Sequence, residues 1–178
     1  MWWSGAGWCY HNQSRIALIR VTVIAKPEGV FPRLRKRAEN SILKSLNINV
    51  GTKTRHVKTI TEADVMRFAE LSGDFNPVHV SEDFARKTLF GGRIAHGMLV
   101  AGFISAAVAK LPGLVIYLSQ TVKFLKPVRI GDSITATAEV IDKDDTKGIL
   151  KLKTTCINQD DETVVSGESR VRIYKTVG

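Results

Sequence analysis

The chain has 178 residues, of which 44% are hydrophobic and 24% are charged, so it has the size and apolar content of one ordinary globular domain with a substantial core. Its formal net charge of +9 would by itself suggest nucleic acid or an acidic membrane surface as a partner. However, residues 1–53 carry nine Lys or Arg against two acidic residues, whereas residues 54–178 carry 17 against 15. The basic character therefore belongs to the N-terminal segment, and a nucleic-acid partner is not expected for the rest of the chain.

The first 50 residues show no sustained helical or strand period, and Pro27, Gly29 and Pro32 interrupt any helix there. An Arg-containing, acid-poor segment with scattered Ser and apolar residues is typical of a mitochondrial transit peptide. We interpret residues 1–50 as a basic leader that directs the chain to the mitochondrial matrix, with a disordered basic tail as the alternative. Residues 51–178 are expected to form the folded domain.

The two cysteines, Cys9 and Cys156, lie far apart without the spacing of a metal site, so neither a disulfide framework nor a zinc site is expected. Cys156 falls in a strand-like segment, where a buried structural thiol is the usual case. No run of 18 apolar residues occurs, and the most apolar stretch, residues 98–108, is too short to cross a bilayer. The sequence therefore predicts no transmembrane helix.

The chain changes character at Gly51. Residues 52–60 are typical of a strand, and Thr61 then provides the side chain of a helix N-cap, with acidic residues following in the first turn. Apolar residues recur at helical spacing until Gly73, which is typical of a helix end. A loop is predicted around Asn76.

A short helix is predicted over residues 81–87, followed by a break at Gly91-Gly92. The next helix begins near Gly97 and continues to Lys110, where Pro112 follows. Its residues are apolar nearly all round, so we expect it to be buried on every side.

After this helix the apolar period changes to two, which predicts strands. Turn residues divide the segment into four strands, over residues 114–125, 133–141, 149–158 and 163–175. A curved antiparallel sheet wrapped around one central buried helix satisfies both patterns, so the fold class is α+β.

Two short segments contain the residues that we expect to carry chemistry. The first places Asp74 and His79 five residues apart on an irregular loop that leaves a helix. Gly73 and Pro77 constrain the backbone there, which allows both side chains to converge on one point. A carboxylate beside an imidazole commonly holds an acid or a base near neutral pH. Asn76 is expected to orient either partner through its amide.

The second segment, residues 91–98, leads into the apolar helix. Backbone N–H groups at a helix N-terminus stabilise negative charge on oxygen, and Gly97 permits close approach of a ligand to the backbone. Simpler roles stay open: a turn at Asp74, a structural role for His79, and helix–sheet packing at Gly97. We interpret His96 as a local hydrogen-bonding residue only.

Residues 72–79, SGDFNPVH, with Ala85 six residues further on, resemble the signature of the MaoC-like, or R-specific enoyl hydratase, family. The run HGML at residues 96–99 is similar to the start of that family's central helix. A third similar stretch comprises residues 117–120, Phe124, Pro127-Val128 and Gly131-Asp132. The resemblance covers residues 52–175 and implies a single hot-dog fold. With its leader, the chain is most similar to the mitochondrial members of the family, hydroxyacyl-thioester dehydratase type 2.

The resemblance implies a lyase that reversibly removes water from a (3R)-hydroxyacyl thioester of acyl-carrier protein or coenzyme A, in mitochondrial fatty-acid synthesis. It implies that Asp74 and His79 handle the water and the C2 proton, while the N–H of Gly97 holds the thioester oxygen. It also implies a homodimer and no metal or organic cofactor. Candidate basic residues for the carrier's phosphate are Arg93, Lys123, Lys126 and Arg129.

Two other functions stay open at this point. A hot-dog acyl thioesterase would use a carboxylate nucleophile or base without the Asp-to-His spacing found here. A non-catalytic, RNA-associated basic protein would show basic residues interleaved with aromatics, whereas Trp2, Trp3 and Trp8 precede the Arg cluster.

Overall fold

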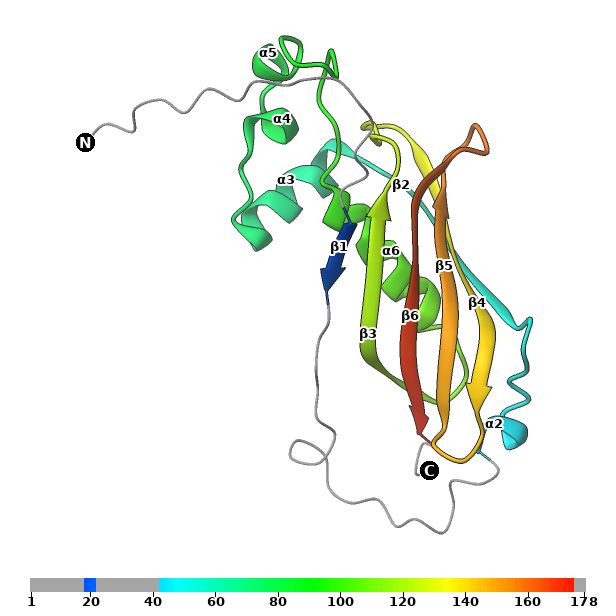
Figure 1. The fold of residues 1–178 in the computed structure, drawn as a ribbon. Coiled ribbons are helices and arrows are strands. Elements are labelled where there is room, and N and C mark those ends of the chain that lie inside the picture. Colours follow the sequence, from blue (N-terminus) through cyan, green and yellow to red (C-terminus); the bar gives the residue numbers. More distant parts are fainter. Residues whose placement is uncertain (1–17, 22–41, 175–178) are drawn as a thin grey trace.

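The computed structural model describes residues 18–21 and 42–174, so most of the predicted leader lies outside the described residues. Within this part of the chain, one antiparallel sheet has the strand order β1-β3-β6-β5-β4-β2 (Figure 1). The strands are β1 (Leu18–Val21), β2 (Lys53–Thr59), β3 (Leu114–Phe124), β4 (Ser133–Asp144), β5 (Ile149–Ile157) and β6 (Thr163–Tyr174). The helices are α2 (Ile42–Ser45), α3 (Glu62–Ser72), α4 (Pro77–Val80), α5 (Glu82–Ala85) and α6 (Gly97–Val108).

The α+β prediction of a curved sheet around a central helix is confirmed. In β4 the buried residues alternate with partly exposed ones, which gives the sheet one apolar face, as the period of two indicated. Helix α6 packs across that face (Figure 1). None of the helices in the described part of the chain is long and apolar enough to span a membrane.

Only the side of α6 that faces the sheet is fully buried. Val100, Ile104 and Val108 are each 1% exposed and belong to the core. Met98, by contrast, is 47% exposed, and Ser105, on the same stripe of the helix, is also exposed. The helix is therefore not buried on every side in the single chain, because its outer stripe faces away from the sheet.

Helix α3 begins and ends where the sequence predicts. The Thr61 side chain accepts a hydrogen bond from the Asp64 N–H, and the Asp64 carboxylate accepts from the Thr61 N–H, which completes a capping box. Gly73 closes the helix in the left-handed conformation. Local side-chain chemistry alone accounts for both ends.

Two predictions on helices need correction. The expected loop around Asn76 contains the helical turn α4, because Asn76 acts as its N-cap and Pro77 occupies the first helical position. The helix expected over residues 81–87 is only α5, capped by Ser81. Helices α3, α4 and α5 gather at one end of the sheet, beside the start of α6 (Figure 1).

The core extends N-terminal to Gly51. Leu43 in α2 and Ile48 after it are both 0% exposed and pack within the main apolar cluster. The folded domain therefore includes at least residues 42–50, which fall within the range that we interpreted as leader. Transit-peptide character before residue 42 stays a prediction.

Candidate active site

The connection between α3 and α4 carries the expected acid–base pair. Gly73, with φ of 77°, turns the chain out of α3. The Asp74 N–H then donates to Ser72 Oγ at 3.2 Å, and the His79 N–H donates to the Asn76 carbonyl at 2.9 Å. These short-range bonds fold position 79 back towards position 74.

Asn76 contacts both this turn and the Asp74 side chain. Its Oδ1 accepts from the Val78 N–H at 3.3 Å, which caps α4, the helix that carries His79. Its own N–H donates to Asp74 Oδ1 at 3.2 Å. The side-chain amide thus contacts the backbone of the helix that carries His79, and the backbone N–H of Asn76 contacts the Asp74 carboxylate.

Two histidines link this turn to the segment before α6. His79 Nδ1 lies 2.8 Å from the Ile94 carbonyl, and His96 Nε2 lies 2.9 Å from the Asp74 carbonyl. A carbonyl only accepts, so each of these nitrogens carries the proton. His79 consequently has its lone pair on Nε2, and His96 has its lone pair on Nδ1.

Asp74, His79 and His96 form one cluster, in which one carboxylate oxygen or ring nitrogen of each residue lies within 4.8 Å of the others. The two imidazole rings are 4.0 Å apart between centroids and tilted by 34°. His96 is 1% exposed, His79 is half-buried and Asp74 is exposed. The cluster is therefore shielded from solvent at His96 and accessible to solvent at Asp74. One carboxylate and two imidazoles are also a ligand set for a divalent metal.

Burial is the main reason why the pKa of His79 lies below its ordinary value of 6.5. The neighbouring His96 ring lowers this pKa further, while the Ile94 carbonyl and the Asp74 carboxylate oppose the shift. His79 is therefore neutral at pH 7, with a free lone pair on Nε2. A neutral imidazole next to an exposed carboxylate is equipped to accept and return protons.

Sequence reasoning did not place His96 in the site. Its interpretation as a hydrogen-bonding residue is confirmed, but the acceptor is the backbone of Asp74, 22 residues away. The ring also packs against Phe68 of α3, at 4.9 Å between centroids. The available signal was its position immediately before Gly97, at the start of the apolar helix.

Gly97 is the first residue of α6, and His96 provides no side-chain cap to this helix. The first N–H groups of a helix have no acceptor within it, so those at the start of α6 are left for another partner. A Cβ at position 97 would lie 2.8 Å from Cε1 of Phe124 on β3. The absence of a side chain at Gly97 therefore lets α6 pack against Phe124, which is the simpler role considered for this residue.

An arginine joins the helices around the site. Arg93 makes two hydrogen bonds to the Glu62 carboxylate, at 2.7 and 2.5 Å, and also pairs with Glu82 at 3.6 Å. Arg129 donates to the carbonyls of Phe90 and Gly92. Both arginines, expected as phosphate ligands, are engaged in holding the segment that leads to His96.

Of the other two candidate basic residues, Lys126 pairs with Glu162, which immediately precedes β6. Lys123 is exposed on β3 and has no ion pair within the described part of the chain. Lys123 is therefore the one candidate whose charge is not already compensated by an acidic side chain or committed to backbone carbonyls.

The thiol of Cys156 is buried under α6, where Sγ contacts the Val100 carbonyl at 3.7 Å. Burial raises the pKa of this thiol to about 12. The group is protonated at neutral pH, which confirms its interpretation as a structural residue.

Known proteins share the sequence and the fold of this chain. The family described as MaoC like domain matches residues 45–161. An (R)-specific enoyl-CoA hydratase of Rhodospirillum rubrum is 46% identical over 129 residues, which cover 71% of this chain and 89% of that protein. A mitochondrial 3-hydroxyacyl-[acyl-carrier-protein] dehydratase of Arabidopsis thaliana is 36% identical over 146 residues, 79% of this chain and 87% of that protein. The solved (R)-hydratase from A. caviae, described as involved in PHA biosynthesis, has a TM-score of 0.69 and 40% identity, covering 71% of this chain and 98% of that one.

Proposed function

The chain belongs to the MaoC-like domain family, and on this premise we propose that it is a hydro-lyase that interconverts a (3R)-hydroxyacyl thioester and an enoyl thioester. The observation that carries the proposal is the cluster of Asp74 and His79 at the start of α6. Relatives named hydratase and dehydratase support the same reaction in both directions.

In the dehydration direction the C2–H and C3–O bonds break, a C2=C3 double bond forms and water leaves. The Asp74–His79 pair takes the C2 proton and returns a proton to the departing C3 hydroxyl, so that no net proton is gained. The lowered pKa of His79 favours this role, because a neutral imidazole is available as a base at pH 7. With both groups on one side of the substrate, elimination is syn.

The thioester oxygen becomes more negative as the C2 proton leaves. The N–H of Gly97 at the start of α6 holds this oxygen, where the helix dipole adds to the hydrogen bond. Since a C2 proton is only weakly acidic until the carbonyl accepts charge, the base and the N–H donor act together.

The thioester is carried by acyl-carrier protein or coenzyme A, and we place the reaction in fatty-acid synthesis in the mitochondrial matrix. Mitochondrial dehydratases of Arabidopsis thaliana and Solanum lycopersicum, and the basic leader, support this location. Lys123 is the candidate contact for the carrier's phosphate.

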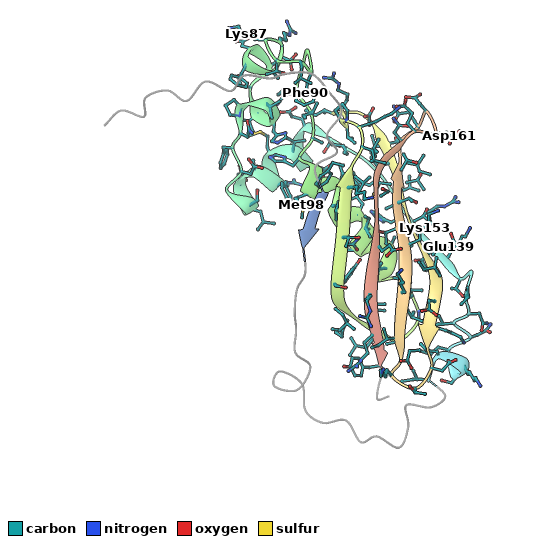
Figure 2. All side chains as sticks on the ribbon, viewed as in Figure 1. Lys87, Phe90, Met98, Glu139, Lys153 and Asp161 are labelled. Carbon is teal, nitrogen blue, oxygen red and sulfur yellow. The ribbon has the colours of Figure 1, made fainter. Side chains whose placement is uncertain are left out.

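We expect the working form to be a homodimer. Large apolar side chains are exposed around the site: Leu71 at 87%, Phe75 at 53% and Met98 at 47%. Figure 2 shows Met98 at the end of α6 that meets the helical cluster. Exposed apolar surface of this kind is typical of an interface, and a second copy of the chain would cover it.

The test is hydration of crotonyl-CoA by the full chain, followed as loss of the enoyl thioester absorbance, with chiral analysis of the product. The proposal expects only the (3R) product, and a loss of at least about 100-fold in Asp74→Asn and in His79→Ala. Asp83→Asn, an exposed carboxylate on α5, is the matched control and retains activity. A folded chain that hydrates neither coenzyme A nor acyl-carrier-protein thioesters refutes the proposal, and release of free thiol indicates a thioesterase.

A further inference from the structure

We propose that His96 is a positioning residue, which holds Asp74 in reach of the substrate by binding its backbone carbonyl. This inference rests on the proposed function, because it concerns the same site. It goes beyond the acid–base pair by assigning a task to a residue that does not face the open side of the cluster.

The first observation is that Asp74 has local hydrogen bonds within its turn and one long-range hydrogen bond, from His96. Asp74 is exposed, and its hydrogen bonds within the turn are local: its N–H donates to Ser72 Oγ, and its Oδ1 accepts from the Asn76 N–H. The bond from His96 Nε2 to the Asp74 carbonyl, at 2.9 Å, joins it to a distant and buried part of the chain. Local bonds shape the turn, but only a long-range bond fixes where the turn lies relative to α6.

The second observation is that the segment carrying His96 is itself well anchored. The Ala95 N–H donates to the Val128 carbonyl at 2.8 Å, and Ile94 forms an isolated β-bridge with Arg129. Arg129 also donates to the Gly92 carbonyl at 3.0 Å. His96 therefore connects an exposed turn to a segment tied to the strand connection beyond β3.

The third observation is that each histidine binds a backbone carbonyl of the segment that carries the other histidine. His79 reaches from the turn to the Ile94 carbonyl, and His96 reaches from that segment back to the Asp74 carbonyl. Their rings are 4.0 Å apart, so a movement of either ring changes the environment of the other. This reciprocal arrangement couples the position of Asp74 to that of His79.

The fourth observation concerns His96 Nδ1, which is buried and has no hydrogen-bond partner. The ring is held instead by packing, against Phe68 at 4.9 Å and against His79 at 4.0 Å between centroids. His96 is therefore fixed by its neighbours, and its hydrogen bond goes to the carbonyl of Asp74.

The experiment compares His96→Gln with His96→Ala in the full chain. A glutamine amide retains a donor near the place of Nε2. His96→Gln is expected to keep kcat within about tenfold of the wild type, whereas His96→Ala loses about 100-fold in kcat with little change in KM, because Asp74 is misplaced. His56→Ala, which removes an imidazole of β2 that packs on Phe103 of α6, is the control and keeps kcat.

A second readout does not depend on activity. Hydrogen exchange of the backbone amides over residues 74–79 should be faster in His96→Ala than in the wild type, because the turn has lost its bond to His96, and close to the wild type in His96→Gln. The proposal is overturned if His96→Ala keeps its kcat, if His96→Gln loses as much kcat as His96→Ala, or if exchange over residues 74–79 is the same in His96→Ala and the wild type. Lack of wild-type activity on any thioester would refute the proposed function, and hydrogen exchange would still test whether His96 holds the turn.

Discussion

The ring of Phe124, at the end of β3, lies against the backbone of Gly97, the first residue of α6. A Cβ at position 97 would come within 2.8 Å of Cε1 and 3.0 Å of Cδ1 of this ring. The contact sets the distance between the last part of the strand and the helix end that we expect to hold the thioester oxygen.

Gly97→Ala therefore forces Phe124 or the start of α6 to move. We expect a loss of about 1–3 kcal/mol in the free energy of unfolding, together with a fall in kcat, because the helix N–H groups are displaced from the oxygen. Denaturant unfolding and the crotonyl-CoA assay measure the two effects. Gly102→Ala in the same helix meets nothing within 4 Å and should leave stability unchanged or raise it by up to about 1 kcal/mol. Equal effects of the two substitutions would contradict the packing argument.

The pH dependence follows from His79. Its pKa in the folded chain is below 6.5, mainly because of burial, so the neutral base persists as the pH falls through 6.5. We expect kcat/KM to decline only at lower pH, as His79 becomes protonated. The pH profile of kcat/KM reports this value for the free enzyme. An acidic limb centred at or above 6.5 would show that another group controls the reaction.

His79 also links stability to pH. Its pKa is lower in the folded chain than in the unfolded chain, so the unfolded chain binds more protons just below pH 6.5. Stability should therefore decrease as the pH is lowered through this window. His79→Gln should reduce that dependence, which chemical denaturation at several pH values would detect.

Divalent metals should inhibit and chelators should have no effect. The proposed chemistry uses the lone pair of His79 directly, so EDTA is expected to leave kcat unchanged. Zn²⁺ would bind the cluster of Asp74, His79 and His96 and occupy that lone pair. Asp74→Asn should weaken Zn²⁺ binding measured by calorimetry. Loss of activity on dialysis against EDTA, restored by a metal, would require a different mechanism.

The Arg93–Glu62 pair should stabilise the arrangement of helices around the site. The Arg93 side chain is 19% exposed and its geometry is bidentate, but Glu62 is 53% exposed, so solvent weakens the interaction. A double-mutant cycle with Arg93→Gln and Glu62→Gln should give a coupling of about 1 kcal/mol or less. Arg93→Lys should not restore it, since lysine lacks the planar pair of donors. A cycle with no measurable coupling would assign the contact no energetic role.

The proposed dimer is tested at the exposed end of α6. Met98→Glu places a charge within the apolar surface around the site and is expected to give a monomer in light scattering after size exclusion. Val57→Glu, at a position 58% exposed on β2, is the control and should leave the association unchanged. A wild-type chain that is monomeric at micromolar concentration would count against the dimer.

Much of this fold was predictable because its signals are local. The capping box at Thr61, the left-handed Gly73 and the alternation along β4 depend on residues that are neighbours in the chain. The hot-dog architecture followed from one apolar helix and a series of strands, and the short spacing from Asp74 to His79 indicated a shared site. The turn α4 was also accessible in principle, through Asn76 and Pro77, but it was assigned to a loop.

The hydrogen-bond partners of His96 and Arg93 were decided only by tertiary structure. Their partners, the Asp74 carbonyl and the Glu62 carboxylate, lie 22 and 31 residues away along the chain. No periodicity or capping pattern encodes such a bond, because it depends on the path of the intervening turns and on which groups lose contact with water. The sequence by itself determined the strands β2 to β6 and the helices α3 and α6, and it indicated the Asp74–His79 pair that we propose as acid and base. The packing of the helical cluster against α6 decided which neighbours hold that pair and how strongly its imidazole binds a proton.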